Sequence, residues 1–285
     1  NSDLTRSIPY SSYSMDFDGV NDYIQLASSS TAIVDWTQPY SISLWVKYST
    51  SLSWDVMATF GVETGSASTT RYIMIGGNSG YLFTGVGDTD GGTTTIKFDI
   101  GSGLNDDNWH HVVYIGDGTS GDFPTVYIDG VVAAPSAGTT NLYNSSTYLN
   151  VIGTGSTATG RYFPGKISNV SIFNTALTED QILTIYNGGV PNNISNLSPV
   201  GWWSLAGDSY YNGTSWICPD LGSGSNNGTS ANMAGTELVG DGPGSSANGT
   251  ATNMDIPFNL KGDAPNSTSN AFSVNMDSQD RVASV

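Results

Sequence analysis

The stretch from Tyr13 to Leu26 has the pattern of two short strands around a tight turn. In its first half, Tyr13, Met15 and Phe17 alternate with polar residues, which is the period-two pattern of a half-buried strand. Residues 18–22 then combine one glycine with three Asp or Asn residues, and both residue types favour tight turns. A chain that begins in this way is expected to build a sheet from short strands.

A degraded copy of this stretch recurs near the end of the sequence. Residues 272–277 match residues 13–18 class by class, and Gln279 to Val282 follow after a one-residue deletion. Because the first copy opens a module, the second predicts that the C-terminal part is the start of another module whose body is missing.

The rest of the chain continues the pattern of short strands. Residues 41–48, 108–115, 149–153 and 165–173 read as strands, and Asp129-Gly130 is a residue pair typical of a type I′ hairpin turn. Only 12% of the residues are charged, while glycine, serine, threonine and asparagine are abundant, as in a turn-rich sheet protein. The prediction is an all-β fold, a two-sheet antiparallel jelly-roll sandwich with one short helix and a loop-rich C-terminal extension.

One helix is expected after Thr178. Thr178 can cap its first turn together with Gln181, and residues 187–189 (Asn-Gly-Gly) can end it. Its apolar face is predicted to consist of Ile182, Leu183 and Tyr186.

The charge of the chain excludes two classes of partner. There are 25 acidic and 8 basic residues, the net charge is −17, and the basic residues are scattered singly. Nucleic acids and anionic membrane surfaces require clustered Lys and Arg, so neither is expected as a partner. No apolar run approaches membrane-spanning length, and the lone Cys218 cannot form a disulfide framework.

Several segments resemble the laminin G-like, concanavalin A-like lectin/glucanase superfamily in their family order. They are residues 17–24, 41–46, 109–112, 126–130, 163–167 and 172–178. The resemblance implies a sandwich of two curved antiparallel sheets over residues 1–190. It also implies that residues 191–285 resemble the front end of a second module, because a Trp-Trp strand and a loop like residues 220–229 normally precede the opening strand in this family. Such tails resemble those in structural proteins of marine bacterial viruses.

The sequence gives little support for catalysis. Glucanases of the superfamily carry a Glu-x-Asp-x-x-Glu strand, whereas Glu63, Glu179 and Glu237 lie in three unrelated places. His110 and His111 are adjacent in an expected strand, so they point to opposite faces and cannot chelate one ion together. The chain is therefore predicted not to be an enzyme.

A structural calcium ion is the one cofactor that the resemblance implies. Relatives often hold calcium near the opening strand and turn, which here contain Asp18, Asn21 and Asp22. Calcium prefers carboxylate and carbonyl oxygens, which such a turn supplies. The family's second acidic position reads Ser168-Asn169 here, which departs from the pattern, and the alternative is that these residues only stabilise the turn.

Aromatic side chains are the candidates for glycan contacts. Sugars stack on aromatic rings that have polar groups nearby, and the alternative for each ring is a place in the core. The candidates are Trp36, Trp54, Tyr72, Tyr81 and Tyr162.

The predicted function is that of a non-catalytic, surface-exposed structural or adhesive protein. It is expected on a virion surface, as a capsid decoration or fibre component, or in another extracellular setting, with glycan binding for host attachment left open. Its expected partners are neighbouring copies, other surface proteins and cell-surface glycans. The alternatives are a secreted bacterial carbohydrate-binding module and a glycan-active hydrolase, and the missing glutamate motif counts against the hydrolase.

Overall fold

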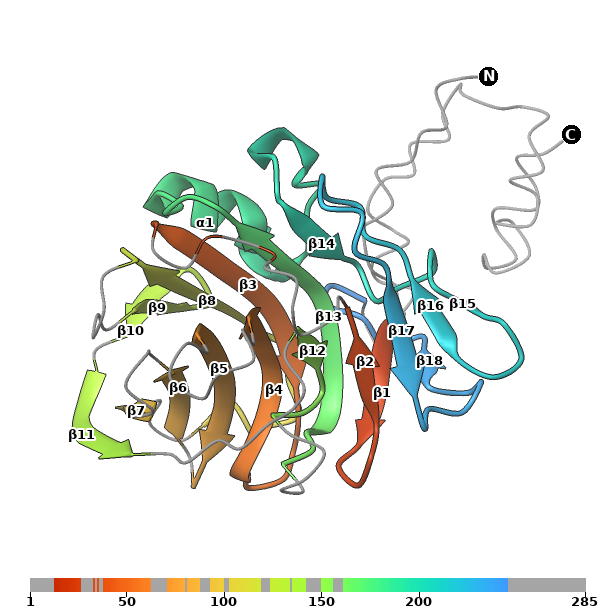
Figure 1. Cartoon of the computed structure of the whole chain (residues 1–285), viewed down its shortest axis with the longest axis horizontal. Coiled ribbons are helices and arrows are strands. Elements are labelled where there is room, and N and C mark those ends of the chain that lie inside the picture. The colour runs from red at the N-terminus through yellow and green to blue at the C-terminus, as the bar shows by residue number, and fades with distance from the viewer. Residues whose placement is uncertain are drawn as a thin grey trace, which may run out of the picture. The chain divides into compact units, whose positions relative to one another are not determined.

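A computed structural model describes residues 13–26, 33, 35, 38–62, 71–79, 81–87, 93–99, 103–118, 124–133, 135–141, 150–155 and 161–245. Contacts divide the chain into a compact unit of residues 1–245 and a second unit of residues 246–285, and all described residues belong to the first. The described residues of this unit form a sandwich of two antiparallel sheets with one short α-helix, which confirms the predicted fold class (Figure 1).

The first sheet has eight strands. Along the sheet they are β10 (Val131–Ala133), β9 (Thr125–Ile128), β8 (His110–Gly116), β3 (Tyr40–Lys47), β13 (Pro164–Phe173), β1 (Ser14–Asp18) and β18 (Leu238–Val239), with β14 (Gly201–Trp203) also paired to β13.

The second sheet has ten strands. In order they are β11 (Pro135–Asn141), β7 (Thr93–Asp99), β6 (Tyr81–Gly87), β5 (Arg71–Asn78), β4 (Ser53–Val62), β12 (Val151–Ile152), β2 (Tyr23–Gln25), β17 (Gly228–Ala231), β16 (Trp216–Cys218) and β15 (Tyr210–Tyr211).

The opening stretch forms the two expected strands, and they lie in different sheets. β1 pairs with β13 and β18, whereas β2 pairs with β12 and β17. The turn between them therefore carries the chain from one sheet across to the other. Gly19 makes this turn with a φ of 74°, and a Cβ at this position would lie 2.7 Å from the Cβ of Pro164. The close approach and the left-handed backbone together explain the glycine.

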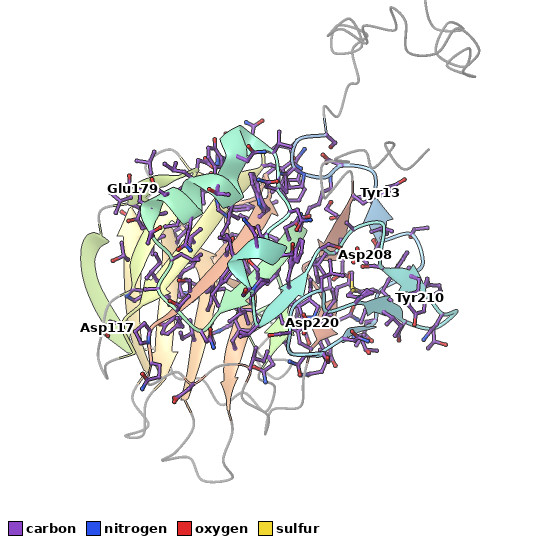
Figure 2. All side chains as sticks on the ribbon, turned by 90° about the horizontal axis from the view of Figure 1, so that it is seen from above. Tyr13, Asp117, Glu179, Asp208, Tyr210 and Asp220 are labelled. Carbon is purple, nitrogen blue, oxygen red and sulfur yellow. The ribbon has the colours of Figure 1, made fainter. Side chains whose placement is uncertain are left out.

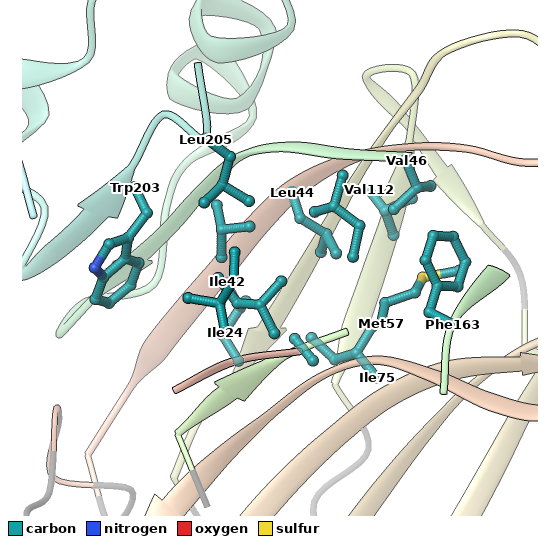
Figure 3. Packing of buried hydrophobic residues seen from close by; sticks show 14 of the residues in the cluster. Ile24, Ile42, Leu44, Val46, Met57, Ile75, Val112, Phe163, Trp203 and Leu205 are labelled. Atoms are coloured by element: carbon teal, nitrogen blue, oxygen red, sulfur yellow. The ribbon is translucent and has the colours of Figure 1, made fainter. Parts of the chain in front are cut away.

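The core lies between the two sheets. Ile42, Leu44 and Val46 of β3 point into it, as their alternation predicts, and they pack with residues of the second sheet such as Met57 and Ile75 (Figure 3). Each of these five side chains has 0% relative exposure, so the alternating apolar residues of β3 all lie in the core.

The outer face of the first sheet is covered by helix α1 (Glu179–Tyr186). Thr178 caps it with Gln181 in a capping box, and Asn187 ends it in the left-handed conformation, as expected. The predicted apolar face is wrong in one position, because Ile185 is buried with Ile182 whereas Leu183 is 46% exposed.

Two short 3₁₀ turns connect α1 to the C-terminal segment. They are η2 (Asn187–Gly189) and η3 (Ser195–Leu197). From there the chain returns to the first sheet at β14, where Trp203 lies opposite Val170 of β13.

Residues 201–239 add strands to both sheets of the same sandwich. β14 and β18 join the first sheet, and β15, β16 and β17 extend the second, so that Trp203, Leu205 and Trp216 share one core with Ile24 and Ile42. The structure thus contains no break at residue 190 within the compact unit of residues 1–245, although a domain boundary is expected there. The repeat at residues 272–282 lies outside the described residues, and its interpretation as the start of a second module stays a prediction.

None of the helices in the described part of the chain combines the length and the apolar character that crossing a membrane requires.

Candidate functional site

An irregularity in β4 places Trp54 on the outer face of the second sheet. The register between β4 and β5 shifts between Ser53 and Asp55, so Trp54 is the extra residue of a β-bulge. Its φ is 64°, a left-handed conformation that is uncommon for a bulky residue. Bulges re-aim side chains and occur next to functional sites, so this position is a candidate on structural grounds as well as on sequence grounds.

The indole of Trp54 lies against an aromatic residue of β6. Its ring centroid is 5.5 Å from that of Phe83, at an interplanar angle of 53°. Phe83 is buried, and its ring reaches over Gly76, where an added Cβ would lie 2.7 Å from the ring. Tyr81 is two residues before Phe83 on the same strand and therefore points to the same face. Trp54, Tyr81 and Phe83 are called the Trp54 face below.

A small buried cluster supports the Trp54 face from beside it. Val56, Met74 and Phe83 are each 0% exposed and form a cluster separate from the main core. Trp54 packs against this small cluster. Because the neighbouring residues Met57, Ile73 and Ile75 point into the core, alternation places this cluster on the opposite, outer side of the sheet.

Residues 161–163 run beside β4 where β12 ends. The Val56 N–H donates to the carbonyl of Arg161 at 3.3 Å, and Tyr162 forms a bridge with Val56. The Arg161 guanidinium lies 4.0 Å from the sulfur of Met74, so a cation stands next to the supporting cluster. Tyr162 is only 8% exposed, which favours a packing role over a surface role for this candidate.

The predicted glycan residues therefore separate into three groups. Trp54 and Tyr81 are partly exposed on one face, and Tyr162 is buried nearby. Trp36 lies outside the described residues, and so does the side chain of Tyr72, whose backbone is part of β5.

The predicted calcium ligands form a tight hydrogen-bonded turn. Asp18 Oδ1 accepts from the backbone N–H groups of Val20 at 2.7 Å and Asn21 at 3.1 Å, and Asp22 Oδ2 accepts from the Asp18 N–H at 3.1 Å. Among the described residues, no group of three or more His, Cys, Asp or Glu side chains is arranged to hold a metal ion. This geometry favours a turn-stabilising role, and calcium binding by Asp18, Asn21 and Asp22 stays a prediction.

A further acidic residue, Glu237, approaches this turn from the C-terminal segment. The Asp16 N–H donates to the carbonyl of Glu237 at 2.9 Å. Burial, followed by the charges of Asp22, Asp16 and Asp18, raises the pKa of Glu237. Burial also raises the pKa values of Asp16 and Asp22. At neutral pH these carboxylates thus repel one another in the folded state.

Glu237→Gln is accordingly expected to raise the melting temperature at pH 7 in EDTA by about 1 °C. A raised folded-state pKa means that the charged form costs stability above that pKa and costs nothing below the unfolded value of 4.5. The gain should therefore disappear near pH 4, which differential scanning calorimetry at the two pH values would reveal. Glu179→Gln, at the exposed start of α1, is the control, and an equal gain at both pH values would contradict the proposed repulsion.

The two histidines occupy different environments, as their adjacency predicts. His111 is fully buried, shares a 2.8 Å hydrogen bond with Ser43 Oγ and stacks on Trp45, and burial lowers its pKa to about 3. His110 Nδ1 lies 2.7 Å from Asp129 Oδ2 and its Nε2 lies 3.1 Å from Asp106 Oδ1. Burial opposes the charge on His110, but the hydrogen bonds and charges of Asp129 and Asp106 together outweigh it and raise the pKa. Both imidazoles thus have structural partners.

The three glutamates do not come from one strand. Glu179 begins α1, Glu237 precedes β18, and Glu63 lies outside the described residues. The described part of the chain therefore contains no strand with the paired glutamates that glucanases of the superfamily carry.

Exposed tyrosines at the far end of the sandwich are a feature that the sequence reasoning missed. Tyr210 is 57% and Tyr211 is 38% exposed on β15. The available signal was an adjacent pair of tyrosines just before Asn212-Gly213, a turn-forming pair, in a segment otherwise rich in small polar residues.

Comparison with solved structures finds chains with a similar fold. One structure, described as a carbohydrate-binding protein from Bacteroides ovatus ATCC 8483, aligns with 20% identity and a TM-score of 0.52. The alignment covers 79% of this chain and 59% of that chain. This chain thus spans less than two thirds of that relative, and at this identity the likeness shows the fold alone.

Two further structures align less closely. The SAP-like pentraxin of Limulus polyphemus has 16% identity and a TM-score of 0.42, over 62% of this chain and 82% of its own. Domain 4 of AbnA, a GH43 extracellular arabinanase from Geobacillus stearothermophilus solved with arabinotriose, has 18% identity and a TM-score of 0.41, over 61% of this chain and 76% of its own. No curated protein matches the chain.

The family is settled by a match to a sequence model rather than by these structures. The model Laminin_G_3, described as the concanavalin A-like lectin/glucanases superfamily, matches residues 18–183. This range begins at the opening turn, ends within α1 and covers more than half of the chain. The chain therefore belongs to the Laminin_G_3 family of the concanavalin A-like lectin/glucanases superfamily.

Proposed function

We propose that this chain is a non-catalytic glycan-binding module and that the Trp54 face is its contact surface. The observation that carries the proposal is the bulge at Trp54, which holds a partly exposed indole in a left-handed backbone conformation over Phe83. A sugar ring presents C–H groups on one face and hydroxyls around its edge, so a flat indole beside polar groups suits it.

Neighbouring groups complement the indole. Tyr81 supplies a second aromatic ring with a hydroxyl on the same face of the sheet, and Asp55 is partly exposed next to Trp54. The bulge is fixed by the Ser53 N–H, which donates to Asp55 Oδ2 at 2.8 Å, so the indole is held before any ligand arrives. A preorganised aromatic ring loses little conformational freedom on binding.

A non-catalytic role fits the distribution of the carboxylates. Glycosidic hydrolysis needs two carboxyl groups placed on either side of one bond. The acidic cluster of residues 16–22 and Glu237 accepts backbone hydrogen bonds or experiences mutual repulsion. It lies on β1, in the turn before β2 and in the segment before β18, and not on the Trp54 face.

A place on a virion or another extracellular surface is the second part of the proposal. It rests on the resemblance of residues 191–285 to tails of viral structural proteins and on the acidic, weakly charged composition. Association with neighbouring copies or with other surface proteins belongs to the same proposal. Cosedimentation of the protein with purified particles would support it, and recovery only as a free protein would contradict it.

Trp54→Ala is expected to weaken glycan binding at least tenfold. A central aromatic contact typically contributes 2 kcal/mol or more to binding, that is, on the order of a thirtyfold change in affinity. The wild-type chain would first be screened on an array of neutral gluco-, galacto-, manno- and arabino-oligosaccharides, and the best binder would then be titrated by calorimetry.

The matched variants separate a lost contact from a lost fold. Trp54→Phe should retain part of the affinity, and Leu183→Ala, which removes an exposed apolar side chain on α1, should retain all of it. A folded Trp54→Ala chain that binds the same number of equivalents as wild type with unchanged affinity would remove the Trp54 face from the proposal.

A further inference from the structure

Three exposed tyrosines lie at the end of the sandwich that residues 199–245 complete. Tyr13 is 43%, Tyr210 is 57% and Tyr211 is 38% exposed. The Tyr13 ring lies 3.6 Å from the position that a Cβ of Gly207 would occupy, three residues before Tyr210. Figure 2 shows Tyr13, Asp208 and Tyr210 at the same end, far from Asp117. These three tyrosines are called the tyrosine edge.

The strand that bears two of these rings is held rigidly. Tyr211 lies against Trp216, with ring centroids 5.5 Å apart, and the Trp216 Nε1–H donates to the carbonyl of Ala234 at 2.7 Å. The turn after Tyr211 is fixed by Asn212, whose side-chain oxygen accepts from the N–H groups of Thr214 at 3.0 Å and Ser215 at 2.9 Å. Exposed aromatic rings on a fixed hairpin are preorganised for contact, since little side-chain entropy is left to lose.

The two neighbouring tyrosine rings of β15 point to opposite sides of the strand. Tyr211 pairs across the ladder with Trp216, which belongs to the core, and Tyr210 pairs with Ile217. Alternation therefore turns Tyr210 to the outer face of the sheet and Tyr211 to the open end between the two sheets. Tyr13 points in the same direction as Tyr211, because it lies two residues before the core residue Met15 and shares its face. A ligand chain that passes around the end of the sheet can touch both sides.

The charge at this end favours an uncharged ligand. Between Ala206 and Trp216 the only charged residue is Asp208, and its carboxylate accepts a hydrogen bond from Ser204. Lys47 and Lys166 are engaged by Asp241, and the whole chain carries a net charge of −17. An anionic polysaccharide or a nucleic acid would be repelled here.

The size of the surface favours a glycan over a protein partner. The three rings expose on the order of 300 Å² in all, given that a tyrosine buries 150–250 Å² when fully covered. A stable protein interface buries about 800 Å² on each side. A few sugar rings match the smaller area, and the tyrosine hydroxyls can bond to the edges of those rings.

We propose that the tyrosine edge is a second contact site for neutral glycans, separate from the Trp54 face. The inference rests on the proposed glycan-binding function and adds a second site with its ligand class. Two sites on one chain would let a long polysaccharide engage both, so that binding to a polymer becomes much tighter than binding to a short oligosaccharide.

Calorimetric stoichiometry on the full chain tests the second site. With the neutral oligosaccharide that binds best on the array, wild type should bind two equivalents. Tyr210→Ala/Tyr211→Ala should bind one, Trp54→Ala should also bind one, and the triple variant none. Tyr210→Phe/Tyr211→Phe should keep two equivalents with affinity reduced about threefold, because the rings remain. Melting curves confirm that each variant is folded.

The outcomes distinguish the two proposals. A folded Tyr210→Ala/Tyr211→Ala chain with unchanged stoichiometry and unchanged affinity for the polymer overturns the second site and leaves the Trp54 face intact. A Trp54→Ala chain that binds as wild type, while the tyrosine variant binds nothing, overturns the Trp54 face and supports the tyrosine edge. Wild type that binds no neutral glycan overturns both, and self-association that the tyrosine variant abolishes, seen by analytical ultracentrifugation, would assign the surface to a second copy instead.

Discussion

Replacing Trp203 with alanine is expected to lower the free energy of unfolding by about 3–5 kcal/mol. Trp203 is 0% exposed in the core between the sheets, and its Nε1–H donates to the carbonyl of Asn226 at 2.8 Å. Its removal leaves a cavity beside Ile24 and Ile42 and a carbonyl without this donor (Figure 3). Equilibrium unfolding in urea, followed by circular dichroism, measures the loss.

The size of this effect decides whether residues 199–245 belong to the sandwich. Tyr210→Ala, which truncates a side chain that is 57% exposed, is the control and should change the free energy by no more than about 0.5 kcal/mol. A loss below about 1 kcal/mol for Trp203→Ala would contradict its place in the core and would return the segment to the role of a peripheral extension.

Local chemistry made several elements predictable. The capping box at Thr178 and Gln181, the left-handed ending at Asn187 and the Asp129-Gly130 turn all depend on residues that are close in sequence. Both turn residues have positive φ, 51° and 78°, as a type I′ turn requires. Such features need no knowledge of the rest of the fold.

The pairing of strands was harder to predict from the sequence, because a strand pairs with the sheet edge left by strands that are distant in the sequence. β1 and β2 adjoin in sequence but lie in separate sheets, since β13 and β18 flank one and β12 and β17 flank the other. The family order implies that a Trp-Trp strand precedes the opening strand, whereas here β14 follows the module and still pairs with β13. The position of a strand in a sheet depends on which sheet edge is free to pair with it, and the residues of the strand itself do not reveal which edge that is.

The same distinction applies to the candidate site. Trp54 could be selected as an aromatic residue in a strand, but the bulge that turns it outward arises from the register between β4 and β5. For α1, periodicity proposed Leu183 for the buried face, and the packing against the first sheet buries Ile185 instead. Exposure of Tyr210 and Tyr211 follows from the position of β15 at the end of the second sheet, which the sequence does not disclose.

A cluster of charges attaches the end of the described chain to the first sheet. Lys47 and Lys166 lie directly opposite each other on β3 and β13, and both contact Asp241 Oδ2, at 3.1 and 2.6 Å. Trp109 Nε1–H donates to Asp241 Oδ1 at 3.4 Å, and Ser14 Oγ donates to the Asp241 carbonyl at 2.8 Å. Two facing lysines would repel each other without this carboxylate.

Asp241→Asn is therefore expected to lower the free energy of unfolding by about 1–3 kcal/mol at pH 7. The lysine side chains are only 12% and 24% exposed, so they would keep partly buried charges without their main counter-charge. The exposed Asp107 near Lys47, Asp16 opposite Lys166 and the remaining contact with water reduce the loss below that of a fully buried pair. Asp107→Asn is the matched control, because Asp107 is 3.9 Å from Lys47 but 69% exposed, and it should cost at most about 0.5 kcal/mol.

The pH dependence of this difference has a defined sign. Burial opposes the charge on Asp241, but the hydrogen bonds and charges of Lys166 and Lys47 outweigh it and lower the pKa. The stabilisation is thus complete above the unfolded value of 3.8 and is lost as the pH falls through the lowered folded-state pKa. Burial likewise opposes the charge on Lys166, but Asp241 raises its pKa above 10.5, so the contribution is complete below that value and is lost at more alkaline pH. Urea unfolding from pH 2 to pH 9 should show wild type and Asp241→Asn converging only at the acid end, and a constant gap across this range, or none at pH 7, would contradict the role of the Asp241 carboxylate.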